Sequence, residues 1–402
     1  MLSNYSIVHS QEGSKEPLAR LWNIDDDEIH EYLNIERKLI MVDGILRPLL
    51  DNDNFSGTRI DVIHNKIFIN TLNFARADEI KNLTQINQYI DLLEFEEAFY
   101  STTKLKSNLG GILKLADVYN AAAIGYIDVE FNNIVITSCL GDIYRNNGFL
   151  TAIKIYKPDP LLSFYDCGAG ISNTSSNDME PKVVAKQVVK EILAGDGIYS
   201  PSEINGSIGF TGCSAGFWAR NQANINYIAT SGHCFVDSDL FYLRSQMDPS
   251  DLIGQMIYHL QSPDFGLIYL DLENVRPIPC IRNRNSRQFP ELIINDQIAV
   301  SSIGGHLCHS GLTTNVECGY VKSLNRDGFF RNPTYFSDDI LIADAWSRGG
   351  DSGGPVFYYK DLMNVSLNGI LATGISDQIS GIFVAVPLSS ILNTIDINVV
   401  TA

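Results

Sequence analysis

The sequence lacks an excess of basic residues. Its 402 residues include 29 Lys and Arg against 47 Asp and Glu, which gives a formal net charge of −18. Nucleic acids and anionic membrane surfaces repel such a protein, so we expect neither as a partner. No apolar run reaches the ~20 residues that a membrane-spanning helix needs. The 45% hydrophobic content instead indicates a globular protein of two or three domains, which we expect to be a monomer.

A signal peptide and a metal-binding pattern are also missing. The opening stretch MLSNYSIVHSQEGSKEPLAR has neither a basic start nor an apolar core. We therefore expect either that the chain does not follow the usual export route, or that its signal has been removed or lost from the gene model. No Cys-x-x-Cys pair occurs, and five histidines are scattered without metal-ligand spacing: His9, His30, His64, His259 and His306. We expect no metal and no other cofactor.

The seven cysteines are spaced in a way that suits local disulfides. Spacing alone does not prove connectivity, and the pairings to consider are Cys213 with Cys234, Cys308 with Cys318, and Cys139 with Cys167, which would leave Cys280 odd. Disulfides of this kind would indicate an oxidising compartment.

The chain changes character at GAGISNTSSNDMEP, Gly168 to Pro181, which predicts a surface linker. Before it, DDDEIHEYLNIERKLIMV and NLGGILKLADVYNAAAI are typical of helices, while TRIDVIHNKIFINTL and GYIDVEFNNIVITSC predict hairpins that turn at His64-Asn65 and Asn132-Asn133. This pattern predicts an α+β domain. After the linker, KVVAKQVVKEIL has the valine spacing of a short amphipathic helix. From Ile208 on, short strands alternate with turns, which indicates an all-β sandwich or pair of barrels.

One serine is placed where chemistry is possible. In RGGDSGGPVF, Arg348 to Phe357, turn-forming or polar residues fill every position from 350 to 355. Such a turn can aim the Ser352 hydroxyl and the backbone N–H groups of Gly350 and Ser352 at one point, as an oxyanion hole requires. Ser352 could equally be only a small residue that fits a tight turn. To act as a nucleophile it would need a histidine and a carboxylate from elsewhere in the chain.

Both partners are available on the β-rich part. His233, in TSGHCF, follows an apolar strand and adjoins Cys234, which would hold its ring rigidly for general-base work. Asp264, in SPDFGLIYLD, precedes another apolar strand and could fix the imidazole tautomer. Asp271 competes with it for that role, and each residue has an ordinary structural explanation. The order His, Asp, Ser on one all-β domain favours the catalytic interpretation.

With these stretches the chain resembles the chymotrypsin-like serine proteases, and within them the bacterial α-lytic protease and streptogrisin group. The matching segments occur in order and cover most of Ile192 to Pro387: AGDGIYS, CSAGFWA, TSGHCF, SPDFGLI, CHSGLTTNVECG and GGDSGGPVF. The resemblance implies two six-stranded antiparallel β-barrels and the disulfides Cys213–Cys234 and Cys308–Cys318. It implies that His233 is the general base and acid, Asp264 its orienter and Ser352 the nucleophile, with the N–H groups of Gly350 and Ser352 as the oxyanion hole.

The same resemblance implies a zymogen. Residues 1–191 resemble the family's pro-region, most of all in FSGTRIDVIHNKIFINTLN, and residues 192–402 its protease domain. In the family the pro-region assists folding and blocks the cleft until it is cut away. We therefore expect cleavage near Glu191–Ile192, secretion, and peptides, proteins and the chain's own pro-region as binding partners.

The chain also departs from the family. Trp346 stands where a third cysteine is usual, and Ala372 aligns with a serine that normally bonds the triad aspartate. His309 replaces an arginine, so we expect a pH-dependent partner for Asp351. The substrate pocket is predicted from five positions without an acidic base: Trp346, Ser347, Ala372, Thr373 and Gly374. This pocket disfavours Lys and Arg and favours small or medium apolar side chains before the scissile bond.

Two alternatives to a processed protease remain. A catalytically silent homologue could serve as a binding module, a reading that the departures at Trp346 and Ala372 support. An uncut enzyme could be regulated permanently by its N-terminal domain, a reading that the missing signal peptide supports.

Overall fold

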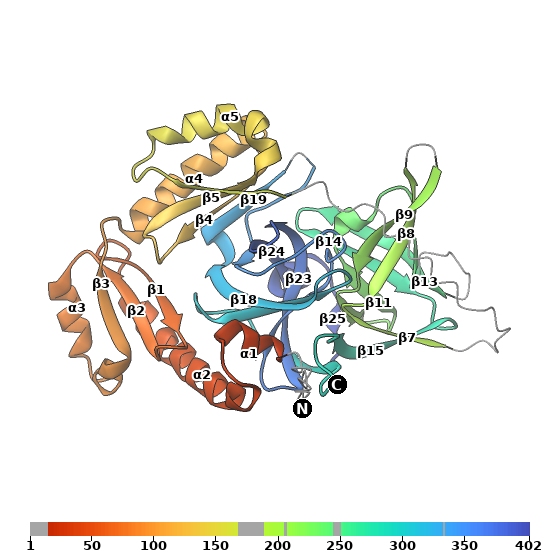
Figure 1. Cartoon of the computed structure of the whole chain (residues 1–402), viewed down its shortest axis with the longest axis horizontal. Helices are drawn as coiled ribbons and strands as arrows, with labels where there is room; N and C mark the ends of the chain where they lie inside the picture. The colour runs from red at the N-terminus through yellow and green to blue at the C-terminus, as the bar shows by residue number, and fades with distance from the viewer. Residues whose placement is uncertain (1–14, 168–188, 205–206, 244–250, 333) are drawn as a thin grey trace, which may run out of the picture.

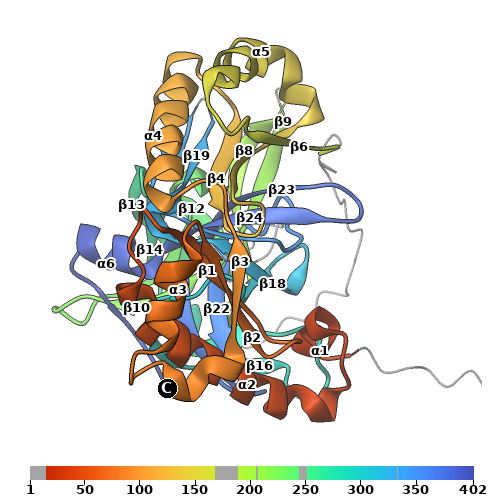
Figure 2. The same cartoon turned by 90° about the vertical axis from the view of Figure 1, so that its left-hand side faces the viewer.

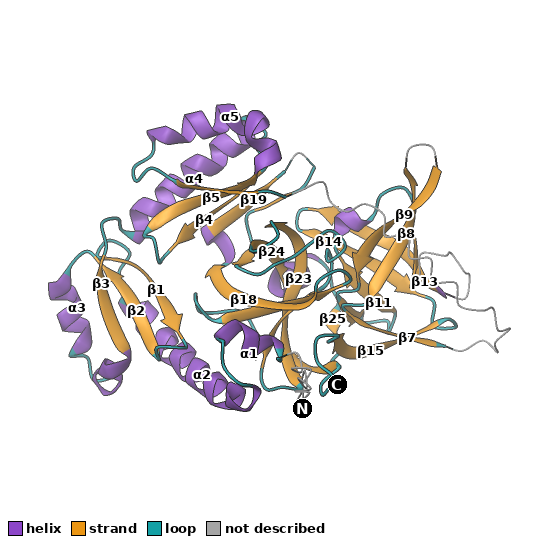
Figure 3. Ribbon diagram, viewed as in Figure 1, coloured by secondary structure: helices purple, strands orange, loops and turns teal. Residues whose placement is uncertain are grey.

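The computed structural model describes residues 15–167, 189–204, 207–243, 251–332 and 334–402. Helices gather in the N-terminal part and strands make up nearly all of the rest, as Figure 3 shows. This distribution confirms an α+β region followed by an all-β domain. Within the described ranges, no helix combines the length and the apolar character needed to span a bilayer.

The N-terminal region opens with two helices and a three-stranded sheet in the order β1-β2-β3 (Figure 1). Its elements are α1 Pro17–Trp22, α2 Ile29–Leu46, β1 Phe55–Asp61, β2 Lys66–Thr71, α3 Phe74–Lys81 and β3 Leu93–Glu97. The hairpin predicted at His64-Asn65 is confirmed, because β1 pairs antiparallel with β2 and Asn65 adopts the left-handed φ of 52° that a tight turn favours.

The second part of this region shares a sheet with the C-terminal domain. Its own elements are α4 Thr102–Val118, β4 Ala123–Asp128, β5 Asn133–Cys139, α5 Ile143–Ala152 and β6 Leu161–Tyr165. The sheet order is β20-β19-β4-β5-β6, where β19 Gly328–Arg331 and β20 Phe336–Ser337 come from far along the chain. Figure 1 shows α4 and α5 over this sheet. The hairpin predicted at Asn132-Asn133 is confirmed, and Cys139 is bonded to Cys167.

The helix predicted in KVVAKQVVKEIL is wrong at its described end. Residues 182–188 lie outside the described residues, as does the linker Gly168 to Pro181. Beyond them, β7 Lys190–Ala194 is a strand that pairs in parallel with β15 Val275–Arg282. Ile192 and Leu193 are both buried there. Tertiary burial on a sheet therefore overrides the local helical spacing.

The all-β domain begins with an eight-stranded sheet in the order β25-β10-β11-β14-β13-β12-β8-β9. Its strands are β8 Gly197–Ile204, β9 Ser207–Ser214, β10 Phe217–Arg220, β11 Asn226–Thr230, β12 Leu240–Tyr242, β13 Leu252–Gln261, β14 Asp264–Leu270 and β25 Asn398–Val399. A core of buried side chains lies on it, among them Ile198, Phe241, Ile253 and Ile268.

A second sheet closes into a barrel. Its order is β22-β17-β18-β21-β24-β23-β16-β15-β7, and an additional β22–β23 pairing joins the first six strands into a ring. The further elements are β16 Glu291–Gln297, β17 His306–Gly311, β18 Asn315–Ser323, β21 Leu341–Ala343, β22 Pro355–Tyr359, β23 Asn364–Ser376, β24 Gly381–Pro387 and α6 Leu388–Thr394. The predicted trypsin-like two-barrel fold is confirmed, with strands added at the sheet edges.

The N-terminal helices pack on this barrel as part of one core. Leu18 and Trp22 of α1 and Leu33 of α2 belong to the same buried apolar cluster as Val316 and Phe357 of the barrel. Figure 2 shows α1 and α2 in the lower part of the molecule, and α1 lies against β18 of the barrel. Burial of this kind gives the contact the character of a protein interior.

Candidate active site

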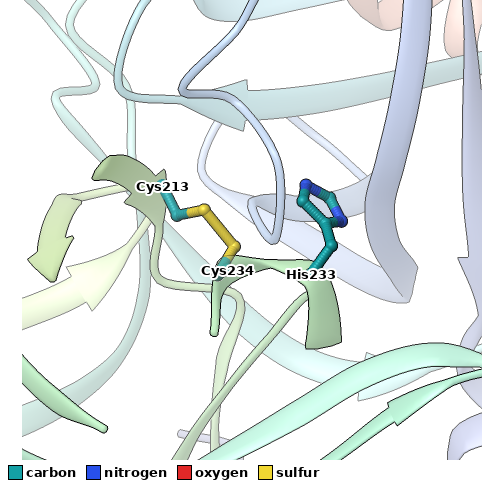
Figure 4. Close-up of side chains that lie close together, drawn as sticks. All are labelled: Cys213, His233 and Cys234. Carbon is teal, nitrogen blue, oxygen red and sulfur yellow. A yellow bond between two sulfur atoms is a disulfide. The ribbon is translucent and has the colours of Figure 1, made fainter. Parts of the chain in front are cut away.

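His233 lies in a short turn held by a disulfide. The turn Gly232–Cys234 follows β11, and Cys234 is bonded to Cys213 at the end of β9. Figure 4 shows the imidazole beside this disulfide. The two sulfur atoms and the ring lie within 4.8 Å of one another, but sulfurs joined in a disulfide are not thiolate ligands for a metal. The bond instead fixes the backbone from which the ring projects.

Asp264 holds His233 through two hydrogen bonds. Its Oδ1 accepts the backbone N–H of His233 at 2.9 Å, and its Oδ2 lies 2.6 Å from the ring Nδ1. The aspartate side chain is 5% exposed and the histidine side chain 24%, so the carboxylate is buried while the ring reaches solvent. Both bonds orient the ring with Nδ1 toward the carboxylate, which leaves Nε2 directed outward.

The competitor Asp271 lies at the other end of β14. Its carboxylate accepts bonds from the backbone of Glu273 at 3.1 Å and the side chain of Asn274 at 3.0 Å, which cap its own turn. Seven residues of extended strand separate it from Asp264, a distance of about 23 Å. Of the two acids, only Asp264 is placed to orient His233.

The turn that contains Ser352 packs against the loop that contains His233. The carbonyl of Ser352 accepts the N–H of Ser214 at 2.8 Å, next to the disulfide. Gly353 has φ 84°, and a Cβ added there would lie 2.8 Å from the backbone nitrogen of Ser231, two residues before His233. The two segments therefore meet backbone to backbone. Among the hydrogen bonds of the described residues, none joins Ser352 Oγ to His233 Nε2.

Two backbone N–H groups in this turn lack an acceptor among the residues that the structure describes. Gly350 has φ 100°, and its carbonyl accepts the hydroxyl of Ser214 at 2.8 Å. The N–H groups of Gly350 and Ser352 have no acceptor within the described part of the chain, whereas the N–H of Asp351 between them is bonded to Arg348. A pair of unpartnered N–H groups beside a serine is the arrangement that stabilises an oxyanion.

The partner expected for Asp351 is wrong. Its buried carboxylate is bonded to Thr313, Thr314 and Arg348. His309 instead donates from Nε2 to the carbonyl of Trp346 at 2.9 Å, and its Nδ1 has no partner among the described residues. Burial lowers the pKa of His309, and the charge of Asp351 opposes that shift. The turn is thus held by neutral donors that do not titrate.

The walls of the predicted substrate pocket touch each other. One wall holds Trp346 and Ser347, and the other holds Ala372, Thr373 and Gly374. A Cβ on Gly374 would overlap the hydroxyl of Ser347. Trp346 Nε1 donates to the carbonyl of Asp377 at 2.8 Å, which joins its ring to the tip of the β23–β24 hairpin. These contacts leave little room between the walls.

Tyr335 is a residue of the site that the sequence analysis did not single out. Its ring centroid lies 5.2 Å from that of His233, at an interplanar angle of 55°. Burial, together with the nearby charge of Asp264, raises the pKa of Tyr335. It follows β19, which pairs with β4 of the N-terminal region, so that region reaches the candidate histidine through one hairpin. No local sequence signal identifies such a long-range contact.

Comparisons with known proteins find similarity among solved structures. Thermobifida fusca Protease A is 21% identical over 53% of this chain and 100% of its own, with a TM-score of 0.39. A glutamic acid-specific serine protease with a histidine triad in substrate binding is 23% identical over 52% of this chain and 100% of its own, with a TM-score of 0.43. An α-lytic protease homologue, N4, is 17% identical over 52% and 98%, with a TM-score of 0.41.

No family model matches the chain, and no curated protein matches it. Identities and TM-scores this low leave function to be argued from the chain's own residues. The solved structures similar to about half of this chain are chymotrypsin-like serine proteases of the α-lytic type, the group that the sequence motifs resemble.

Proposed function

We propose that this chain is a serine endopeptidase. The observation that supports it most strongly is the pair of hydrogen bonds between His233 and Asp264. One of them places the ring Nδ1 2.6 Å from the buried carboxylate. This bond fixes the tautomer in which Nε2 can accept a proton. Ser352 lies on the turn that abuts the same histidine loop. The proposal is therefore supported by a base with its orienter on one segment and a serine on the segment packed against it.

The chemistry follows from these roles. His233 Nε2 takes the hydroxyl proton of Ser352 as Oγ bonds to the carbonyl carbon of the scissile peptide. The carbonyl oxygen becomes negative and is held by the N–H groups of Gly350 and Ser352. The imidazolium, stabilised by Asp264, then returns the proton to the leaving amine, and an acyl-enzyme remains. Water, deprotonated by the same histidine, releases the acid and restores the serine hydroxyl.

For the substrate we propose a small apolar side chain before the scissile bond. The contact between Ser347 and Gly374 narrows the predicted pocket, and Trp346 is tied to the hairpin tip. Ala372 contributes only a methyl group to the second wall, and it is 3% exposed. Peptides carrying Ala, Leu, Phe, Lys or Arg at that position test this. Fastest cleavage after Ala supports the narrow pocket, and fastest cleavage after Lys or Arg contradicts it.

We further propose that residues 1–191 are a pro-region and 192–402 the protease, secreted as a zymogen and cut near Glu191–Ile192. The bond lies inside β7, where Glu191 is opposite Arg276 and Ile192 opposite Pro277. A protease binds an extended, unpaired segment, so β7 must leave β15 before this bond can be cut. That requirement favours the uncut, self-regulated enzyme as the second candidate, and it makes processing a late step in the first.

Hydrolysis of a protein substrate such as casein tests the function directly. We expect the wild type to cleave it, the Ser352→Ala variant to be inactive, and the exposed-serine control Ser107→Ala to match the wild type. Loss of activity in neither variant would contradict the assignment. A well-folded wild type that cleaves no peptide would support the silent homologue. Intact mass then separates the two enzyme forms, because a product that starts near Ile192 shows processing.

A further inference from the structure

His306, a histidine with no motif around it, lies where the N-terminal region meets the second barrel. It begins β17, and its side chain is fully enclosed, as is that of Glu36 on α2. Trp22 of α1 meets the ring edge-on at 5.6 Å between centroids, and Tyr358 of β22 stacks on it at 4.1 Å. Residues from two N-terminal helices therefore surround a histidine of the barrel.

Both nitrogens of the His306 ring have partners. Nδ1 lies 2.6 Å from Oε2 of Glu36, and Nε2 accepts the backbone N–H of Tyr359 at 2.8 Å. A backbone N–H can only donate, so Nε2 carries no proton. The single ring proton is therefore on Nδ1, which donates it to Glu36. In this docked arrangement the ring is neutral.

The carboxylate of Glu36 depends on the barrel for its hydrogen bonds. It accepts the ring Nδ1–H of His306, the backbone N–H of His306 at 2.7 Å and the hydroxyl of Tyr358 at 3.0 Å. A buried carboxylate is tolerated only where such donors surround it. The three hydrogen bonds of Glu36 therefore all cross the contact between α2 and the barrel. Two further residues of α2 add to this contact, because Asp43 accepts the hydroxyl of Ser302 and Arg37 donates to the carbonyl of Lys360.

We propose that Glu36 and His306 form an acid-sensitive latch, and that a second proton on His306 releases α1 and α2 from the barrel. A proton on Nε2 would point at the N–H of Tyr359, so two donors would face each other in an enclosed site. In the undocked state water reaches the ring and the imidazolium forms freely. The undocked state then binds more protons than the docked one, so docking weakens as the pH falls.

Other titratable groups near the His306 ring also affect how docking depends on pH. Those with a direct electrostatic or hydrogen-bond link to the contact are Glu16, Arg20, Glu36, Arg37, Asp61, Tyr320, Asp344, Tyr358, Tyr359 and Lys360. The surrounding elements also carry His30, Glu31, Lys38 and Asp43 on α2, His309 on β17, and Glu317 and Lys322 on β18. Arginine, lysine and tyrosine keep one state between pH 5 and 8. Burial raises the pKa of Glu16 and of Asp43, and it raises the pKa of Asp344 to about 6. Acid favours the docked state at these three residues and therefore opposes the latch.

The test uses the full-length chain with Ser352→Ala to prevent self-digestion, and it measures amide hydrogen exchange in α2 after correction for intrinsic rates. An ordinary imidazole titrates near pH ~6.5, so without opposing acids the opening equilibrium of α2 should rise about 20-fold from pH 7 to pH 5. We expect this rise in a background of Glu16→Gln, Asp43→Asn and Asp344→Asn, and a smaller rise in the wild type. The inference rests on the proposed function only for what release achieves, which is to free the region that controls the protease.

Two variants separate the latch from general acid sensitivity. His306→Asn keeps a donor near the Nδ1 position but cannot take a second proton, so its α2 should stay protected at pH 5. His64→Asn alters an exposed histidine paired with Asp61 and should retain the full response. An equal opening of wild-type α2 at both pH values, or an undiminished response in His306→Asn, would overturn the latch.

A second measurement decides the matter if His306→Asn does not fold. The ¹⁵N signals of the His306 ring in the wild type report how many protons it carries. A ring that gains its second proton only as α2 opens supports the latch, and one that gains it while α2 stays protected contradicts it. Neither measurement uses catalysis, so failure here leaves the proposed protease standing. Likewise, loss of the protease assignment would leave the latch intact.

Discussion

The substitution Asp351→Asn tests whether a buried carboxylate builds the serine turn. The Oδ1 of Asp351 accepts the N–H groups of Thr313 at 2.8 Å and Thr314 at 3.0 Å. Its Oδ2 accepts the hydroxyl of Thr314 at 2.8 Å and the N–H of Arg348 at 2.8 Å. The side chain is fully enclosed. Four donors therefore converge on a single charge one residue before Ser352.

An asparagine cannot satisfy all four donors. With its NH₂ group at the Oδ2 position, the hydroxyl of Thr314 can turn and accept, but the N–H of Arg348 faces another donor. One unsatisfied buried N–H costs about 1–3 kcal/mol. The remaining bonds lose their charge assistance, which adds about 1–2 kcal/mol in total. We expect the free energy of unfolding to fall by about 2–5 kcal/mol.

Catalysis should suffer beyond this loss of stability. The Arg348 end of the turn leads into Gly350 and Ser352, whose N–H groups are the proposed oxyanion donors, and loss of one such donor costs on the order of 100-fold in kcat. Urea unfolding and peptide hydrolysis, at a temperature where the variant is folded, measure the two effects separately. The control is Asp377→Asn, whose carboxylate accepts two N–H groups in an exposed turn and should change little. Wild-type stability together with wild-type kcat in Asp351→Asn would refute the reasoning.

Three further outcomes follow from the structure. Gly353→Ala should unfold at lower urea and lose hydrolysis, because φ is 84° and the new Cβ would overlap Thr230; unchanged values would contradict the contact. Replacing both Cys308 and Cys318 by Ala should lower the free energy of unfolding by about 3 kcal/mol on the chain-entropy model, measured without reductant. Burial raises the pKa of Asp43, so its stabilising contribution is present in acid and is lost as the pH rises through that raised pKa. The free energy of unfolding of Asp43→Asn, minus that of the wild type, should therefore rise between pH 4 and 7. A difference that falls over this range would contradict the prediction.

The sequence predicts those features that local chemistry determines. Hairpins at His64-Asn65 and Asn132-Asn133 follow from alternating apolar residues around asparagine, and the structure has both. The spacing of Cys213 with Cys234 and Cys308 with Cys318 corresponds to the disulfides that form. His233 and Asp264 are placed by their strand ends, and the structure brings them into contact.

Features that depend on distant parts of the chain were not predictable. Tyr335 reaches His233 only because β19 joins the N-terminal sheet, a pairing across about two hundred residues. No motif surrounds His306, because the residue that it contacts, Glu36, lies 270 residues earlier in the chain. The substitution of histidine at position 309 suggested a partner for Asp351, but backbone donors from the neighbouring turn take that place. Periodicity and spacing carry no information about such contacts.

The most direct test of the central claim is labelling of the folded full-length chain with a fluorophosphonate probe, followed by mass mapping of the modified residue. We predict one adduct on Ser352, absent in Ser352→Ala and formed much more slowly in Asp264→Asn, because the ring of His233 loses its orienting carboxylate. Labelling that persists in Ser352→Ala, or none at all on the well-folded wild type, would contradict this prediction.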